Sequence, residues 1–338
     1  MRRTLICALC ALLLLLTACA APTGAEAERS VDVYAMDTYM TLRFRGGGEE
    51  LPDALRRRIL ELDGMLSVTG PDSEIARLDR EGRSELSPET AHLLRRALEA
   101  CEWTDGALNI ALYPVVKAWG FTTQEYRVPG QDEIDRLLPL CDWRGVTLEE
   151  NAAALAPGME IDLGSVAKGY TGDVLAGLLR GAGVTSALLD LGGNIQTVGA
   201  RPDGTDWRIA IRDPAGEGTL GVVSVRDEAV ITSGGYERYF TDEQGRVWWH
   251  IMDPATGYPA RSGLLSATVV GREGLVCDAL STALFVMGPE RACRFWREEG
   301  GFEMLLVTDE GLMLATPGLA ERFRPEADRP YGLQIVAE

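Results

Sequence analysis

A short run from Glu160 to Tyr170 constrains the fold of this chain more than any other segment. The run reads Glu-Ile-Asp-Leu-Gly-Ser-Val-Ala-Lys-Gly-Tyr, so an acid, a glycine turn and a lysine stand close together. Ile161 and Leu163 predict the end of a strand, and apolar residues at helical spacing predict a helix that begins near Val166. The run therefore predicts a corner where a strand turns into a helix.

This corner suits a bound phosphate. Backbone N–H groups at the start of the helix and the helix dipole attract an anion, and Lys168 adds a full positive charge. An ordinary strand-to-helix connection with a solvated lysine fits the same pattern, so other segments must decide between the two.

The first residues indicate where the protein works. Two arginines precede the apolar stretch Leu5–Leu16, which is too short to span a membrane comfortably and is typical of a secretory signal. A Leu-Thr-Ala-Cys sequence that ends at Cys19 follows directly and resembles a bacterial lipobox. We predict a lipoprotein signal peptide over residues 1–18, lipid attachment at Cys19, a polar tether over residues 19–29, and an extracytoplasmic location. A plain signal peptide that happens to contain Cys19 is the alternative.

Residues 30–338 have ample length for a hydrophobic core, and no repeat or long linker divides them. They form one large domain or two closely packed ones. The formal charge of the whole chain is −18, and removal of Arg2 and Arg3 with the signal takes it to −20, which argues against nucleic acid as a partner. An anionic ligand then needs a local positive patch or a bound cation.

The cysteines after the signal do not predict a metal site. The chain has no C-x-x-C spacing in this part and only two histidines, which disfavours zinc. The four residues are Cys101, Cys141, Cys277 and Cys293. Disulfides are compatible with an exported protein, and buried free thiols are equally compatible with the apolar surroundings.

The apolar pattern along the chain alternates between strand and helix spacing. Short consecutive strands with glycine and proline turns indicate antiparallel pairing, and a Rossmann fold is disfavoured because no G-x-G-x-x-G follows a first strand. We predict an α+β fold of largely antiparallel sheets flanked by helices. The predicted strands are 31–44, 186–191, 194–198, 207–212, 221–225, 247–252, 304–308 and 311–315, and the predicted helices are 52–66, 88–103, one from Val166, 278–286 and 289–298.

Asp278 and Thr282 form a second group of candidate residues. They lie four positions apart in a helix-like stretch, so their Cβ atoms are about 5–6 Å apart on one helix face. Carboxylate and hydroxyl oxygens suit a hard cation such as magnesium. Capping of the helix by Asp278 and a bond from Thr282 to a backbone carbonyl explain the same pattern without a metal.

His250 begins a third group, His250-Ile-Met-Asp253-Pro-Ala-Thr-Gly257, at the end of a predicted strand. Asp253 and Gly257 fit a turn. His250 is one of only two histidines in the chain, and its position beside this turn makes it a candidate for proton transfer. A buried structural histidine is the alternative.

Together these groups resemble the ApbE family, the FAD:protein FMN transferases. The matching segments run in family order over nearly the whole chain after the signal. They are Met36-Asp-Thr38, Pro71-Asp-Ser-Glu74, Gly106-Ala-Leu-Asn109 with Trp119-Gly-Phe121, Asp162-Leu-Gly-Ser-Val-Ala-Lys-Gly169, Leu191-Gly-Gly-Asn194, Thr232-Ser-Gly-Gly235, His250-Ile-Met-Asp-Pro-Ala-Thr-Gly257 and Asp278-Ala-Leu-Ser-Thr282. Their number and order argue against chance agreement.

The resemblance implies an ApbE-like fold and a magnesium-dependent reaction on FAD. FMN is esterified to a threonine of a target protein, and AMP leaves. Targets in the family resemble membrane redox-pump subunits and other exported flavoproteins. The implied magnesium ligands are Asp278, Thr282 and the carbonyl of Ser165. The implied FAD contacts are Met36, Thr69, Ala107, Leu108, Asn109, Asp162, Lys168, His250 and Ile251, and we add Trp119 as a candidate to pack on an aromatic ring.

Two catalytic roles follow from this resemblance. His250 is the candidate that takes the proton of the acceptor threonine, on the condition that its pKa lies near neutrality, with Asp162 and Asp253 as competitors. Asp278 is the second catalytic candidate, because a metal ion on the diphosphate stabilises the charge that develops on the leaving AMP.

Three residues depart from the family pattern. Asn109 stands where the family often has aspartate, Thr69 stands where an aromatic residue is common, and Ser165 replaces a usual alanine or glycine. The first two changes weaken the implied contacts at these positions, whereas a carbonyl ligand tolerates the third. A hydrolase that splits FAD with water, and a lipoprotein that only binds flavin, are the alternative functions.

Overall fold

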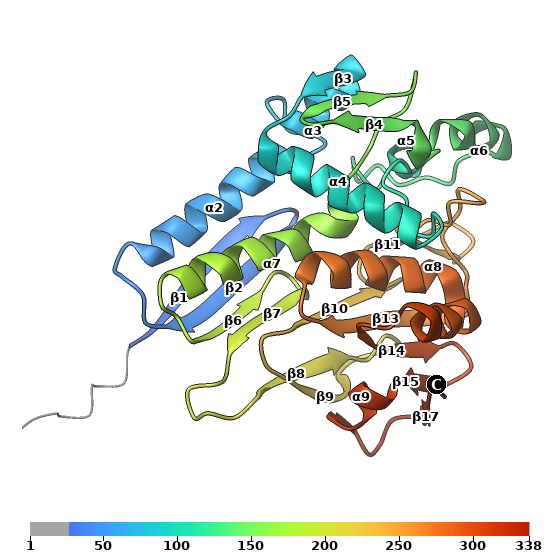
Figure 1. The fold of residues 1–338 in the computed structure, drawn as a ribbon. Coiled ribbons are helices and arrows are strands. Elements are labelled where there is room, and N and C mark those ends of the chain that lie inside the picture. The colour runs from blue at the N-terminus through green and yellow to red at the C-terminus, as the bar shows by residue number, and fades with distance from the viewer. Residues whose placement is uncertain (1–26, 338) are drawn as a thin grey trace, which may run out of the picture.

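A computed structural model describes residues 27–337, and its main sheet has nine strands in the order β1-β2-β6-β7-β10-β13-β14-β15-β17 (Figure 1). Neighbouring strands in this sheet are antiparallel except β15 and β17. The strands are β1 (Glu28–Ala35), β2 (Thr38–Arg45), β6 (Ser186–Asp190), β7 (Ile195–Gly199), β10 (Ala229–Gly234), β13 (Leu264–Gly271), β14 (Glu303–Thr308), β15 (Leu312–Ala315) and β17 (Gly332–Ile335). The predicted α+β class with largely antiparallel sheets is confirmed.

Two long helices, α7 (Gly164–Gly181) and α8 (Gly274–Glu299), cover one face of the main sheet, and α2 (Leu51–Leu66) and α4 (Pro88–Trp103) lie against them (Figure 1). Apolar residues at helical spacing fill the layers between, because the buried side chains of α7 pack with α4 on one side and with β1, β2 and β6 on the other. The remaining helices are α3 (Glu74–Glu81), α5 (Tyr113–Ala118), α6 (Gln131–Leu137) and α9 (Pro317–Ala320).

Three small sheets complete the described chain. The order β16-β9-β8 packs through apolar side chains on the face of the main sheet opposite α8. The other two are β3-β5-β4 near α3 and the hairpin β11-β12. Their strands are β3 (Arg83–Glu85), β4 (Val146–Glu149), β5 (Ala152–Leu155), β8 (Trp207–Arg212), β9 (Thr219–Val225), β11 (Tyr239–Thr241), β12 (Val247–Trp249) and β16 (Phe323–Pro325).

The predicted single strand over 31–44 is wrong, because β1 and β2 form a hairpin whose turn residues Met36 and Asp37 have φ angles of 51° and 58°. Ile161 and Leu163 do not end a strand either. They are buried in an irregular segment, where Asp79 accepts the Ile161 N–H at 2.8 Å. The helices predicted over 278–286 and 289–298 are two parts of α8, which is interrupted at Gly288.

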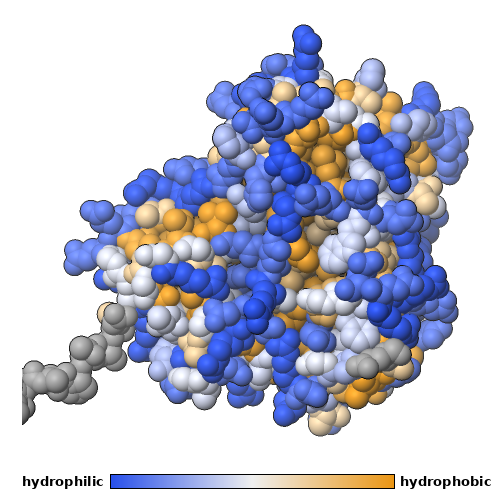
Figure 2. All heavy atoms as spheres, in the orientation of Figure 1, coloured by the Kyte–Doolittle hydropathy of each residue, from blue (hydrophilic) through white to orange (hydrophobic). Residues whose placement is uncertain are grey.

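The predicted tether ends inside β1, which begins at Glu28, while the predicted signal peptide and Cys19 lie outside the described residues. Within residues 27–337, no helix is both long and apolar enough to cross a membrane. The face in Figure 2 is mostly hydrophilic, with apolar side chains gathered in separate smaller areas.

Candidate active site

A cleft of about 830 Å³ opens where the main sheet splits. β7 and β10 pair only through Ala229 with Gln196 and Val230 with Ile195, so the two strands part beyond these residues. The start of α7, the loop after α4, the β1–β2 turn and the residues after β12 line the opening. The predicted site residues that line it are Met36, Thr69, Ala107, Leu108, Asn109, Asp162, Ser165, Lys168, His250, Ile251, Asp278 and Thr282.

Trp119 is the exception, and its predicted contact with a cofactor is wrong. Its side chain is fully buried, packs on Trp248 and Tyr258 at ring-centroid distances of 5.1 and 5.4 Å, and donates from Nε1 to the Gly257 carbonyl at 2.9 Å. Trp119 therefore belongs to the core and fixes the turn that follows His250.

Two glycines let α7 and α8 cross closely enough to bring distant segments together. A Cβ atom at Gly169 would lie 2.2 Å from the Gly274 carbonyl oxygen, so only glycine fits this crossing. Asp173 on α7 then accepts the N–H groups of Gly274 and Leu275 at 2.7 and 2.9 Å, which caps the start of α8. Asp278, one turn further along α8, consequently faces the first turns of α7.

The contact of Asp278 with α7 supports the predicted metal ligands. Its Oδ2 accepts the N–H of Gly169 at 2.8 Å. In a regular α-helix this N–H points to the carbonyl of Ser165, four residues earlier, so the carboxylate lies beside that carbonyl. Thr282 lines the same cleft, and its hydroxyl lies 3.2 Å from the hydroxyl of Ser233. Carboxylate, carbonyl and hydroxyl oxygens are a donor set that fits Mg²⁺.

Replacing Gly169 with alanine is expected to lower the free energy of unfolding by about 1–3 kcal/mol, because the added methyl group overpacks the helix crossing. The displaced α8 would also carry Asp278 away from α7, so FMN transfer should fall. Gly177 is a matched control on α7, since nothing lies within 4 Å of a Cβ atom there. Gly177→Ala should stabilise the protein by roughly 0.5–1 kcal/mol, as urea unfolding would measure, and equal losses in both variants would contradict the crossing argument.

The cleft is electrostatically mixed. Six carboxylates line it, from Asp37, Asp63, Asp162, Asp190, Glu237 and Asp278, against three cations, from Lys168, Arg212 and Arg238. Burial raises the pKa of Asp278 and of Asp162, and the positive charge of Lys168 opposes both shifts. A diphosphate entering this lining needs added positive charge, which a divalent cation beside Asp278 would supply.

The helix start is less open to an anion than the sequence predicts. The N–H of Gly164 donates to Oδ1 of Asp162 at 2.8 Å, and the N–H groups of Val166 and Ala167 donate to the Leu163 carbonyl. Asp162 therefore neutralises part of the helix terminus. Lys168 is the positively charged side chain of this corner that lines the cleft.

His250 is held at the cleft by the β11–β12 hairpin. Its backbone N–H and its Nδ1 lie 3.1 and 3.2 Å from the carbonyl oxygen of Arg238. A carbonyl only accepts, so we assign the ring proton to Nδ1, which leaves the Nε2 lone pair available. Burial, together with the charges of Arg238 and Lys168, lowers the pKa of His250 to about 3, so the imidazole is neutral at physiological pH. The near-neutral pKa expected of this base from the sequence is therefore not found in the protein without FAD.

The side chain of Asn109 is engaged within the protein. Its Nδ2 donates to the Cys141 carbonyl at 2.7 Å, and its Oδ1 accepts the Ala111 N–H at 2.9 Å. Asn109 therefore shapes the loop that lines the cleft rather than offering a free amide.

All four cysteines in the described chain are buried free thiols, which decides against disulfides among them.

The sequence interpretation missed charged residues that follow the Thr232–Gly235 motif. Glu237 and Arg238 line the cleft, and the Arg238 guanidinium lies 3.8 Å from the carboxylate of Asp37 on the β1–β2 turn. Arg212 also lines the cleft, with its guanidinium carbon 5.0 Å from the Tyr236 ring centroid. Their proximity to a recognised motif was the one available signal.

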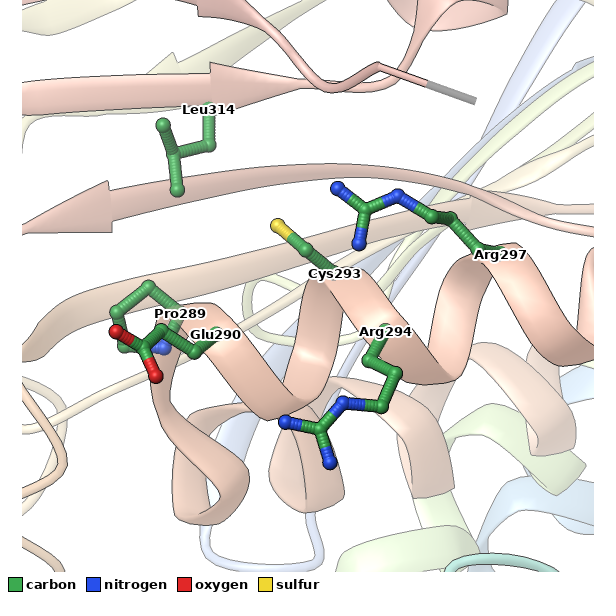
Figure 3. Close-up of a pocket in the computed structure, with 6 residues that line it drawn as sticks. All are labelled: Pro289, Glu290, Cys293, Arg294, Arg297 and Leu314. Carbon is green, nitrogen blue, oxygen red and sulfur yellow. The ribbon is translucent and has the colours of Figure 1, made fainter.

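A second hollow, of about 350 Å³, lies on α8 after its interruption (Figure 3). Cys293 and Arg297 point toward the strand that carries Leu314, whereas Arg294 points away from it. Arg297 donates from Nε to the Ala337 carbonyl at 2.7 Å. The polar groups of this second hollow do not converge on one point. The larger cleft lined by Asp278 and His250 is therefore the candidate active site.

Comparison with known proteins agrees with this geometry. A family model described as the ApbE family matches residues 36–306. The chain belongs to the ApbE family. The family relationship predicted from the motifs is thus confirmed.

Three relatives illustrate the similarity. An FAD:protein FMN transferase of Treponema pallidum is 37% identical over 281 residues, which cover 77% of each chain. An FAD:protein FMN transferase of Klebsiella pneumoniae is 31% identical over 297 residues, 85% of this chain and 92% of its own. The crystal structure of the ApbE protein from Thermotoga maritima superposes with a TM-score of 0.82 at 27% identity, covering 88% of this chain and 100% of that one.

Proposed function

We propose that this protein is an FAD:protein FMN transferase. The carrying observation is the cleft itself, where Asp278 lies beside the Ser165 carbonyl and shares the lining with Lys168 and His250. Curated relatives at 37% and 31% identity are transferases of this name. FAD is accordingly the substrate, and a protein is the acceptor.

The reaction joins the acceptor hydroxyl to the phosphorus on the FMN side of the diphosphate. The threonine oxygen forms the new P–O bond, its proton passes to Nε2 of His250, and the P–O bond to AMP breaks with the electron pair leaving on AMP. Phosphoryl transfer needs mainly positioning and neutralisation of charge, which Lys168 supplies from α7.

Magnesium is part of the proposal because the residues present fit it. Among residues 27–337 no three histidine, cysteine or acidic side chains cluster as metal ligands, so a site must draw on other oxygens. The Asp278 carboxylate, the Ser165 carbonyl and the Thr282 hydroxyl would hold the ion, and FAD oxygens and water would complete six ligands. Bound magnesium neutralises diphosphate charge.

We further propose that the protein works outside the cytoplasmic membrane, anchored by lipid on Cys19. The acceptor would then be an exported flavoprotein or a membrane redox-pump subunit. The support is the short apolar stretch followed directly by Cys19. Replacing Cys19 with serine should release the protein from the membrane fraction, and unchanged membrane association would count against the anchor.

Mass spectrometry of an intact acceptor domain tests the function. After incubation with FAD and Mg²⁺, the acceptor should gain the mass of FMN less one water, on a threonine, with one AMP released per label. Free FMN with no labelled protein would instead select the hydrolase. Intact FAD after long incubation with Mg²⁺ would select the flavin-binding lipoprotein.

A further inference from the structure

The part of the cleft between β8 and β10, called the β8–β10 arm below, is lined on one side by the edge of β8. Four consecutive residues, Ile209, Ala210, Ile211 and Arg212, line the cleft. Successive side chains of a strand point to opposite faces, and Ile209 and Ile211 are buried in the apolar cluster beneath. A cleft lined by four consecutive residues, two of whose side chains are buried, runs along the strand itself.

This edge is open. In the part of the chain that the structure describes, β9 is the only strand hydrogen-bonded to β8. An uncovered edge presents N–H and C=O groups that pair readily with another extended chain, and proteins usually protect such edges. Here the edge is left uncovered inside the catalytic cleft.

β10, on the other side of this arm, also has an unpaired edge within residues 27–337. Thr232, Ser233 and Gly234 of β10 are consecutive and line the cleft, while the pairing of β10 with β7 stops at Val230. Ser233 also contacts the hydroxyl of Thr282, so this wall leads to the proposed metal ligands. The arm between β8 and β10 thus runs toward the reacting centre.

The predicted FAD contacts leave this arm without an assigned ligand. They lie on the β1–β2 turn, the loops after α2 and α4, the corner at the start of α7 and the segment after β12. The proposed reaction requires two substrates in the cleft at once, and the second is a polypeptide. An extended peptide is the ligand whose backbone groups match a strand edge.

We propose that the open edge of β8 docks the acceptor protein, which adds an extended segment along Ile209–Arg212 and directs its threonine toward His250 and Asp278. This inference rests on the proposed transferase function. The exposed side chain of Ala210 lies within this edge. A bulky residue there would obstruct the acceptor segment and leave the nucleotide contacts untouched.

The test compares Ala210→Trp with Arg208→Trp. Arg208 is exposed on the same face of β8 two residues earlier but does not line the cleft. The probe is a purified, threonine-bearing acceptor domain of a membrane redox-pump subunit that the wild-type protein labels. Ala210→Trp should raise KM for this domain at least tenfold and change KM for FAD less than twofold, whereas Arg208→Trp should change neither more than twofold. An unchanged KM for the acceptor, or an equal rise in KM for FAD, would overturn the docking site.

Hydrogen exchange of the wild-type protein gives a second, mutation-free test. Amides in residues 207–212 should exchange more slowly with the acceptor domain bound and at an unchanged rate with FAD alone. Unaltered exchange with saturating acceptor would overturn docking even if Ala210→Trp failed to fold. A wild-type protein that labels no acceptor would overturn the transferase proposal. Labelling that is unaffected by changes at the β8 edge would instead overturn only the docking site.

Discussion

Replacing Asp278 with asparagine is expected to lower the rate of FMN transfer about a thousandfold, equivalent to about 4 kcal/mol of transition-state stabilisation. Asparagine keeps the size of the side chain and an oxygen that can accept the Gly169 N–H. It removes the negative charge that would hold a cation between α8 and the Ser165 carbonyl. Steady-state rates over a range of Mg²⁺ concentrations measure the effect.

The same substitution is expected to preserve or raise stability in the absence of Mg²⁺. Burial raises the pKa of Asp278, so the folded state favours the protonated carboxyl. Its stabilising contribution is present below the unfolded pKa and is lost as the pH rises through the folded value. Above that folded value the wild type therefore bears the cost of a buried charge that asparagine avoids. Mg²⁺ should raise Tm of the wild type and leave Tm of Asp278→Asn unchanged.

Asp173→Asn is the matched control. Asp173 is also an acid at the crossing of α7 and α8, and burial raises its pKa to about 6, but it caps α8 and does not line the cleft. Asparagine keeps only one of the two oxygens that accept these N–H groups, so the substitution should lower stability by about 1 kcal/mol and leave the Mg²⁺ concentration for half-maximal rate unchanged. Equal loss of the Mg²⁺ response in both variants would show that helix packing, and not a ligand, explains the effect of Asp278.

The positions of the long helices were predictable from sequence because their apolar spacing is local, whereas the short helices α3, α5, α6 and α9 were missed. The helix expected over 88–103 is α4, and the one expected over 52–66 begins one residue earlier as α2. Strands β10 and β13 were missed, since both are central in the sheet and read as apolar runs without clear alternation. The β1–β2 turn was missed because Met36 and Asp37 are not the Asn-Gly type that marks such hairpins.

The sequence motifs predicted which residues belong to the candidate site, but not how distant segments approach one another in space. Asp278 and Thr282 share a helix face by spacing alone, but their approach to Ser165 depends on the contact of Gly169 with Gly274, which no local pattern reveals. The prediction for Trp119 was wrong because a motif does not show how deeply a side chain is buried. Its motif position implied a cofactor contact, whereas the surrounding aromatic rings bury it in the core.

Replacing His250 with glutamine is expected to lower kcat by about a hundredfold to ten-thousandfold, the usual range for a lost general base. Glutamine can still bond to the Arg238 carbonyl through its amide, so the affinity for FAD should change little. His92, the other histidine, is exposed on α4 and does not line the cleft. His92→Gln should therefore keep kcat within twofold, and a comparable loss in both variants would contradict the assignment.

The pH dependence separates a proton acceptor from a merely structural histidine. With the pKa of His250 lowered to about 3, the free protein has no His250 ionisation between pH 5 and 8, so kcat/KM for FAD should show no limb from it there. The negative diphosphate raises this pKa once FAD is bound, so kcat should fall on the acid side at a higher pH, and His250→Gln should abolish that fall.

The pH dependence of stability tests the lowered pKa of His250 independently of catalysis. A depressed folded pKa contributes stability that is present above the unfolded value near 6.5 and is lost as the pH falls toward 3. Tm of His250→Gln relative to the wild type should therefore rise steadily from pH 7 to about 4, and a constant difference would mean that the imidazole is not held neutral in the cleft.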